Sequence, residues 1–497
     1  MLKTQIKFRN IPLYLIGAFV FLALFIPIAG IGMYDSKRIF ELCLFVGLSI
    51  LFLCLTFQLK NEKEDLYISH LCATSLCVFT SFGIISAYLS KFPRYGFIEA
   101  FLFSIVILTI ILISKRDVFG HYRLGVFVQS LAVIFSTVYL IYFFGNYIAA
   151  HLNPLVPMWP DRLSVSLHIG DNVYNGKEVL NFVHKRFFNH IQTWTLPLLI
   201  SLALFFKTKK IYRNLLFILI ACWWSLVFAS GARGTLVALI ISGFFLFILF
   251  RKKSYRFLGI AVCTAIAGFV IYYLLFQIFV PSKSLPVARM TDSGRLGMWV
   301  RALEMWFASP LMGAGPMHYA VLQEVPYFAH PHNFYLQLLS EWGGVAFLGF
   351  LALLILYVVF IKKRFLNSNF VFNNLTYRNS TVYMGFFGSA MAGFLHAGVS
   401  GVFHTPVSQI WAIIIISWLI SLWNRKNDNS KIISVKRKHL SVVYLCLIIG
   451  LCILVKPDIP RLDKTHELYR KQFDKPKVHP RFWEQGLIYE DAVNVDN

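Results

Sequence analysis

Residues 211–250 read IYRNLLFILIACWWSLVFASGARGTLVALIISGFFLFILF. Two apolar stretches, 211–229 and 234–250, flank the short interruption SGARG. Each approaches the roughly 20 residues that an α-helix needs to cross the hydrocarbon core of a bilayer. Because lipid offers the backbone no hydrogen-bond partners, such stretches must be helices that satisfy their own amides and carbonyls. This part of the chain therefore predicts two membrane-spanning helices joined by a very short turn.

The same pattern recurs along the chain. Apolar segments of spanning length run over 11–33, 38–58, 66–89, 97–114, 122–148, 191–206, 211–229, 234–250, 257–280, 336–361, 380–400, 406–423 and 440–456. No alternating pattern of barrel strands is visible. The sequence predicts an all-α, polytopic membrane helical bundle of about 12–13 transmembrane helices.

Composition supports the membrane class. Of 497 residues, 58% are hydrophobic and 14% are charged, which excludes an ordinary water-soluble protein. The net charge of +24 would suit a nucleic-acid binder, but Lys and Arg lie in short clusters between apolar segments and form no single basic face. We therefore expect no nucleic-acid partner. All eight cysteines lie inside apolar segments, so neither a disulfide framework nor a thiolate metal site is expected.

Basic residues orient the predicted helices, because cytoplasmic loops retain Lys and Arg. With the N-terminus inside, the layout is N-terminal transmembrane helices over 1–150, an extracytoplasmic loop over 151–190, transmembrane helices over 191–280, a second extracytoplasmic loop over 281–335, C-terminal transmembrane helices over 336–456 and an extracytoplasmic tail over 457–497. We expect water-soluble chemistry in the two loops or in the tail. The tail mixes charged and aromatic residues, which predicts short amphipathic helices on the membrane surface or on the loops.

The second loop and its flanks, 289–346, contain the most informative sequence. Ser293-Gly294 is expected to start a helix on which Arg295 and Trp299 share a face, and Pro310 is expected to end it. A polar turn follows, and His330-Pro331-His332-Asn333 then begins the long apolar helix predicted over 336–361. This order predicts that a histidine lies at the membrane boundary, close to a helix N-terminus.

His332 is the candidate general base. At the boundary its imidazole can exchange protons with water while it faces a lipid-borne substrate. The alternative hypothesis is that His332 or Asn333 only caps the helix. His330 and His332 together make a weak metal pair, because they are two residues apart with no Cys or Asp nearby, and we expect no metal. His330 and Asn333 remain candidate substrate contacts.

Arginines are the candidate anion ligands. Arg233 lies between two predicted spans at the bilayer edge, where an arginine is rare unless it is paired or functional, and its guanidinium suits bidentate phosphate binding. Arg289, Arg295 and Arg301 add positive charge on the same predicted side. This surplus suggests a lipid phosphate or diphosphate. The alternatives are a snorkelling anchor for Arg233 and general headgroup contact for Arg289 and Arg301.

The first loop ends in HKRFFNHIQTWTLPLL, residues 184–199. Asn189 and Gln192 are candidates for hydrogen bonds to sugars, and Lys185 and Arg186 for contacts to phosphate. The alternative is that this stretch belongs to the aromatic belt of the membrane interface. Further along, polar residues flank a suspected helix break near 398–406, where we expect them to hydrogen-bond within the protein.

Three motifs resemble the O-antigen ligase superfamily, which includes Wzy-type O-antigen polymerases and PglL-type protein O-oligosaccharyltransferases. They are SGARG after a span, GRLGMW at the entry to the second loop and HNFYLQLLSEWG at its exit. The clearest element is His332-Asn333 followed by Gly343, whereas Ala346 departs from the residues that the family commonly carries there. The resemblance covers about 230 to 345 by motif, and more loosely the whole many-helix layout.

This resemblance implies a C-type glycosyltransferase-like fold in the bacterial inner membrane, with its active site facing the periplasm. It implies transfer of a glycan from undecaprenyl diphosphate with inversion at the anomeric carbon, and without metal, nucleotide or other cofactor. By motif, Arg233 and Arg295 would bind the diphosphate and His332 would be the catalytic residue.

The acceptor stays open at this level. We expect an O-antigen ligase that joins polysaccharide to lipid A–core. The alternatives within the family are an oligosaccharyltransferase that modifies a pilin-like protein and an O-antigen polymerase. A transporter of polyprenyl-linked glycan, from a different functional class, would also need a basic path, but it predicts midplane charges and paired repeats, which the sequence lacks.

Overall fold

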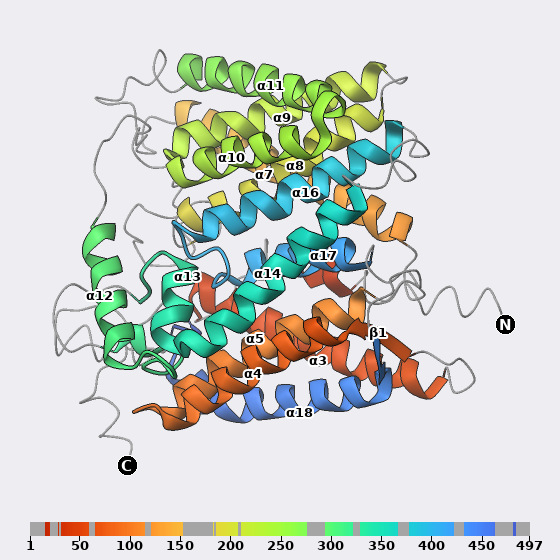
Figure 1. Cartoon of the computed structure of the whole chain (residues 1–497). Coiled ribbons are helices and arrows are strands. Elements are labelled where there is room, and N and C mark those ends of the chain that lie inside the picture. The colour runs from red at the N-terminus through yellow and green to blue at the C-terminus, as the bar shows by residue number, and fades with distance from the viewer. Residues whose placement is uncertain are drawn as a thin grey trace. The chain divides into compact units, whose positions relative to one another are not determined.

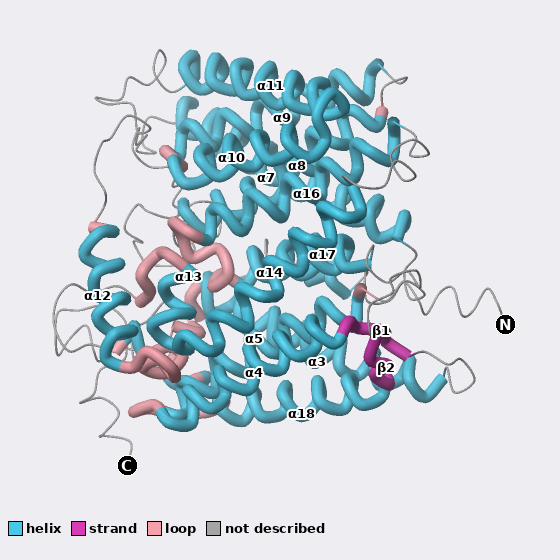
Figure 2. The backbone as a smooth tube through the Cα atoms, viewed as in Figure 1, coloured by secondary structure: helices cyan, strands magenta, loops and turns pink. Residues whose placement is uncertain are grey.

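The computed structural model describes residues 15–19, 28, 31–58, 65–114, 121–152, 182, 185–206, 210–275, 294–321, 329–365, 377–421, 432–462 and 481–483. Over these residues the chain is helical apart from one short two-stranded ribbon and connecting turns (Figures 1 and 2). The prediction of an all-α membrane bundle is confirmed. Arg289 and most of the loop over 151–190 lie outside the described residues.

The elements follow one another in chain order as α3 (Met33–Gln58), β1 (Asp65–Ser69), α4 (His70–Leu89), α5 (Pro93–Ile113), α7 (His121–Leu152), α8 (Lys185–Phe205), α9 (Lys210–Ser230), α10 (Arg233–Phe250), η1 (Arg251–Ser254), α11 (Tyr255–Tyr273), α12 (Arg295–Ala308), η4 (His318–Ala320), α13 (Phe334–Gln337), η5 (Leu338–Trp342), α14 (Gly343–Phe365), α16 (Tyr377–Ala397), α17 (Pro406–Ser421), β2 (Ile432–Lys436), α18 (Arg437–Val455) and η6 (Ile459–Arg461).

These helices match the predicted spans. Each predicted segment from 38–58 onward contains a helix over most of its described residues, although β1 takes the start of 66–89, and of 11–33 only part is described. In the described part of the chain, 8 stretches are long and apolar enough to cross a membrane, and one of them runs from α10 through α11. The suspected break near 398–406 is confirmed, because α16 ends at Ala397 and α17 begins at Pro406. The chain is a multi-pass membrane protein.

Two short strands were not predicted. β1 and β2 pair antiparallel, with Asp65 opposite Lys436 and Ser69 opposite Ile432 (Figure 2). Each strand directly precedes a helix, α4 or α18, and Ser69 caps α4 by accepting a hydrogen bond from the amide of Cys72 at 3.3 Å. A pairing between segments this far apart in sequence cannot be read from either one alone, because each contributes only half of the ladder.

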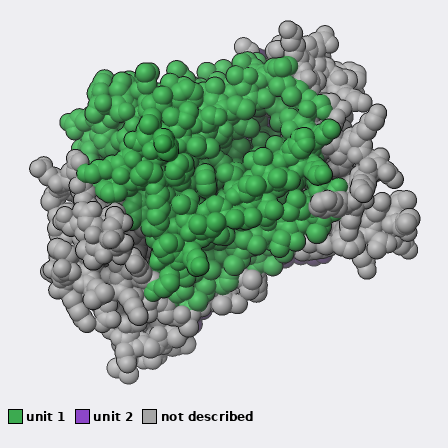
Figure 3. All heavy atoms as spheres, turned by 90° about the horizontal axis from the view of Figure 1, so that it is seen from below, with its two compact units in different colours: residues 1–121, 292–361, 397–497 green, residues 122–291, 362–396 purple. Residues whose placement is uncertain are grey.

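The chain forms two compact units. Unit 1 consists of residues 1–121, 292–361 and 397–497, and unit 2 of residues 122–291 and 362–396; Figure 3 shows one face of unit 1 in green. In unit 1, α5 packs against α4, α17 and α18, and α3 packs against α17 and α18. In unit 2, α8 packs against α9, α10 and α11.

Small residues allow the helices of unit 2 to approach closely. Trp194 of α8 is fully buried, and a Cβ added at Gly393 of α16 would lie 2.1 Å from its indole ring. A Cβ at Gly385 of the same helix would lie 2.3 Å from Oγ of Ser201 of α8, and one at Gly388 would lie 3.0 Å from Leu246 of α10 and 3.2 Å from Pro197 of α8. Because lipid provides little hydrophobic drive for helix association, such close backbone contact supplies much of the packing.

Replacing Gly393 by alanine should destabilise the protein by roughly 1–3 kcal/mol, because the rigid indole of Trp194 cannot yield to the new methyl group. The measurement is the apparent thermal unfolding temperature of the purified protein in detergent. Gly145→Ala is the matched control: its Cβ would meet nothing within 4 Å, and alanine favours helix by about 1 kcal/mol. Equal unfolding temperatures for the two variants would contradict the packing argument.

Candidate functional site

Residues 329–333, which we call the histidine loop, carry the predicted base. Asn333 caps α13: its side-chain oxygen accepts hydrogen bonds from the amides of Tyr335 and Leu336, both at 3.1 Å. The capping role considered for His332 therefore belongs to Asn333. His332 is partly exposed and adopts a φ of +52°, which is costly for a residue with a side chain. Strain of this kind is concentrated at functional sites, where the surroundings enforce it.

His330 holds the backbone of His332 in this conformation. The amide of His332 donates to Nδ1 of His330 at 3.1 Å, and the two rings lie 4.2 Å apart. His330 is 2% exposed, and its ring lies 5.0 Å from that of His404 and against Gly401. His330 is thus buried and supports the loop, and its role as a substrate contact stays a prediction. Among the described residues, no group of three His, Cys, Asp or Glu side chains is arranged to hold a metal ion.

Helix α12 joins Arg295 to the histidine loop. Arg295 is the first residue of α12, after Gly294 at φ +73°, so the predicted helix is confirmed. Trp299 lies one turn later on the same face, and its Nε1 donates to the carbonyl oxygen of Pro331 at 3.1 Å. Pro331 directly precedes His332 in the chain. Arg295 therefore lies about one helical turn from Trp299, the residue that ties α12 to the histidine loop.

Arg301 lies on α12 too, but it contacts η4. Its Nη2 donates to the carbonyl oxygen of Val321 at 3.0 Å, and its guanidinium lies 5.0 Å from the ring centre of Tyr319. The hydroxyl of Tyr319 donates to the carbonyl oxygen of Met298 at 3.0 Å, and burial raises the pKa of this phenol to about 12. Arg301 thus anchors α12 onto η4.

The predicted span over 336–361 is interrupted. Residues 338–342 form a π-helical turn, and Gly343 follows at φ +83°. The turn frees the carbonyl oxygens of Ser340 and Glu341, which accept hydrogen bonds at 2.9 Å from the amides of Ala314 and Gly315. A Cβ at Gly343 would lie 2.2 Å from the carbonyl oxygen of Leu311, so the glycine of the HN motif is required by backbone contact. Such π-turns recur at functional sites.

A buried polar network lies behind the histidine loop in unit 1. Arg481 forms ion pairs with Glu99 and with Glu341, the latter at 2.7 Å. Gln337 donates through Nε2 to both carboxylates, at 3.2 Å to Glu99 and 2.9 Å to Glu341. Its oxygen therefore faces Nε2 of His404 at 2.6 Å, and we assign the proton to that nitrogen. Burial lowers the pKa of His404 well below its usual value, and the charge of Arg481 lowers it further, which favours the neutral imidazole.

The tail residues 481–483 form a turn buried in unit 1, whereas the sequence predicted surface helices. Nη1 of Arg481 donates to the carbonyl oxygen of Ala329 at 2.9 Å, at the start of the histidine loop. Arg38 of α3 donates to the carbonyl oxygen of Phe482, and Nε1 of Trp483 donates to Asp458 at 3.0 Å. These contacts were not predicted, because nothing in the sequence PRFW, residues 480–483, indicates that Arg481 pairs with the buried carboxylates of Glu99 and Glu341. The rest of the tail beyond residue 462 lies outside the described residues.

Unit 2 holds the other predicted phosphate ligand. Arg233 is the first residue of α10, and its position at a helix N-terminus adds its charge to the positive end of the helix dipole. Burial lowers the pKa of Arg186 on α8, and the charge of Arg233 lowers it further. The fold therefore brings two guanidinium groups of unit 2 near each other, and Lys185 lies next to Arg186 in sequence.

The amide side chains predicted to contact sugars are inside unit 2. Asn189 is 3% exposed and accepts a hydrogen bond from the hydroxyl of Ser230 at 3.0 Å. Gln192 is fully buried and donates to the carbonyl oxygen of Trp223 at 3.0 Å. Both hydrogen bonds join α8 to α9. The polar residues at the start of α8 did not indicate from sequence that these two side chains would be buried against another helix.

A known protein family matches the part of the chain that contains these candidate residues. Residues 215–351 match the family model described as O-Antigen ligase. The chain carries an O-antigen ligase domain. The domain begins in α9, ends in α14 and contains Arg233, Arg295 and His332, and the resemblance stated from the motifs is confirmed. Proteins with this domain are glycosyltransferase-like membrane enzymes of the ligase, polymerase and oligosaccharyltransferase type. No curated protein matches the chain.

Several polar residues that support the histidine loop were not predicted from the sequence. They are the polar groups of the buried network: Glu99, Gln337, Glu341 and Arg481. One signal could have identified two of them, since an acidic residue inside a predicted span is expensive unless it is paired, and both Glu99 and Glu341 lie in such spans. The partner lies at least 140 residues away in sequence, and no local pattern selects it.

Proposed function

We propose that this protein transfers a glycan from an undecaprenyl diphosphate-linked donor to an acceptor hydroxyl at the periplasmic face of the bacterial inner membrane. The favoured activity is O-antigen ligation to lipid A–core. The observation that carries the proposal is the match of residues 215–351 to the O-antigen ligase model, which contains both arginines and the histidine selected by motif.

The chemistry assigns a role to each of the three side chains. Departure of the lipid diphosphate develops negative charge on phosphate oxygens, which the guanidinium groups of Arg233 and Arg295 would neutralise. His332 would accept the proton of the attacking hydroxyl, which forms the new bond at the anomeric carbon opposite the departing phosphate oxygen, so that the configuration inverts. The left-handed backbone of His332 and the cap supplied by Asn333 support this role, since they fix the imidazole without using it for capping.

Arg233→Ala and Arg295→Ala should each lower transfer about 10²–10³-fold, because each removes one donor to the leaving diphosphate. The assay follows transfer from a polyprenyl diphosphate-linked glycan in proteoliposomes, with membrane insertion of each variant checked by protease protection. Lys252→Ala, an exposed cation of η1, is the control and should retain full activity. Normal transfer by either arginine variant would refute the diphosphate clamp.

A deletion strain identifies the acceptor. Loss of capped lipopolysaccharide supports ligation, whereas loss of a pilin glycan or shortened O-antigen chains would assign the same donor chemistry to a protein oligosaccharyltransferase or to a polymerase. Unchanged glycans in every fraction, together with impaired movement of a polyprenyl-linked glycan across the membrane, would replace the proposal by a transporter.

A further inference from the structure

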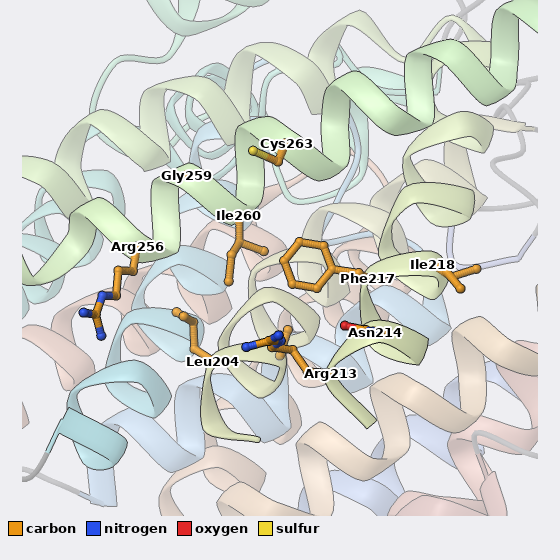
Figure 4. Close-up of a pocket in the computed structure, with 10 residues that line it drawn as sticks. Leu204, Arg213, Asn214, Phe217, Ile218, Arg256, Gly259, Ile260 and Cys263 are labelled. Atoms are coloured by element: carbon orange, nitrogen blue, oxygen red, sulfur yellow. The ribbon is translucent and has the colours of Figure 1, made fainter. Parts of the chain in front are cut away.

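A pocket of about 730 Å³ opens between α8, α9 and α11 in unit 2 (Figure 4). Its lining consists of two arginines, one asparagine and otherwise small or apolar residues: Ala203, Leu204, Arg213, Asn214, Phe217, Ile218, Arg256, Gly259, Ile260 and Cys263. In Figure 4 the side chain of Leu204 lies between those of Arg213 and Arg256, and Ile260 and Phe217 lie beside them. The pocket thus has a basic part and an apolar part.

The packing of α9 against α11 explains why space remains here. At Gly268 the two helices touch, because an added Cβ would lie 2.4 Å from Cβ of Trp224 and 2.6 Å from the carbonyl oxygen of Ala221. About two and a half turns earlier in α11, a Cβ at Gly259 would meet nothing within 4 Å. The helices α9 and α11 therefore pack closely at Gly268 and leave a groove between them near Gly259.

Each helix presents its arginine and its apolar residue on the same face. Arg213 precedes Phe217 by four residues on α9, and Arg256 precedes Ile260 by four residues on α11. Residues at this spacing lie one above the other on a helix surface. The groove therefore offers two guanidinium groups at one end and an aromatic and aliphatic wall directly beside them, which matches a phosphate joined to an acyl chain.

Charge in this region favours an anion. Residues 179–275 contain eleven Lys and Arg and no Asp or Glu, so the helices that form the pocket supply no carboxylate. Guanidinium groups bind phosphate oxygens through paired hydrogen bonds. Both arginines also lie at helix ends predicted to be cytoplasmic, where anionic lipids are enriched and where basic pockets between helices bind their head groups. We propose that this pocket binds an anionic glycerophospholipid, with its phosphate at Arg213 and Arg256 and an acyl chain along Phe217 and Ile260.

The pocket is separate from the proposed transfer site. α9 begins at Lys210 and ends at Ser230, and Arg233 follows directly. At a rise of 1.5 Å per residue, Arg213 lies roughly 25 Å along the helix from the end that leads to Arg233. The lipid site would therefore remain even if the proposed glycan transfer were wrong, and lipid binding can be measured without any transfer assay.

The test is native mass spectrometry of the full-length protein in detergent, titrated with phosphatidylglycerol or with phosphatidylcholine. Wild type should retain phosphatidylglycerol with at least about tenfold higher affinity than phosphatidylcholine. The double variant Arg213→Ala/Arg256→Ala should lose this preference. The control Lys210→Ala/Lys252→Ala removes the same charge from the same helix ends outside the pocket, and should bind within about twofold of wild type.

A second variant tests the apolar part of the groove. A Cβ at Gly259 would meet nothing within 4 Å, so α11 can accept the variant Gly259→Leu without a clash. The leucine side chain would fill the part of the groove that we assign to the acyl chain. Lower occupancy by phosphatidylglycerol in this variant supports the proposal. An arginine double variant with wild-type affinity would overturn it, and so would displacement of the lipid by millimolar inorganic phosphate, because the site would then recognise a free anion.

Discussion

His332→Gly and His332→Ala should both lower the rate of glycan transfer by about 10²–10⁴-fold, the usual contribution of a positioned general base. The affinity for the donor should change little, because the imidazole acts on the acceptor hydroxyl and the donor is held by arginines. A fall in kcat with nearly constant KM for the donor is the expected signature. The measurement is initial rate against donor concentration in proteoliposomes.

The glycine variant separates the side chain from the backbone. His332 adopts a φ of +52°, which glycine accepts more readily than alanine. If the imidazole carries the effect, both variants lose the same activity, and added imidazole should restore part of it to His332→Gly. If His332→Gly keeps more than about a tenth of wild-type activity, the base hypothesis fails, because loss of a general base predicts a larger effect. His439→Ala, an exposed histidine at the start of α18, is the control.

Arg481→Met should destabilise the protein by about 3–5 kcal/mol, because it leaves Glu99 and Glu341 buried without their cation. It also removes the donor to the carbonyl oxygen of Ala329, which holds the start of the histidine loop. Transfer activity should therefore fall together with stability. The measurement is the apparent unfolding temperature in detergent, and the half-life of activity at a fixed temperature, because membrane proteins of this size often unfold irreversibly.

Two further variants show whether burial of charge is the cause. Arg94 pairs with Asp458 in a partly exposed position, so Arg94→Met should cost at most about 1 kcal/mol. The triple variant Arg481→Met/Glu99→Gln/Glu341→Gln removes the stranded charges, and should recover at least half of the lost stability. If Arg94→Met and Arg481→Met cost the same, or the triple variant is the least stable of all, the buried network does not have the energetic role that its geometry implies.

In the candidate site, residues close together in sequence predicted some features and left others undecided. The order of turn, helix, glycine and histidine over 293–333 predicted α12 and the position of His332 at a helix start, because these depend on residues a few positions apart. It left the cap undecided between His332 and Asn333, since both are adjacent to α13 and only the backbone conformation separates them. The π-turn after Gln337 was missed for a related reason: an apolar run has the same composition whether or not one turn is widened.

Sequence alone determined that this protein is a multi-span helical bundle with an O-antigen ligase motif set, because lipid imposes the helical conformation on any long apolar segment and because the motifs are local. Only the tertiary structure decided which distant residues support the histidine loop. Arg481 reaches Glu99 across 382 residues of sequence, and Trp299 reaches Pro331 across 32. Such contacts depend on how helices pack side against side, and the apolar periodicity that predicts a helix carries no information about its neighbours.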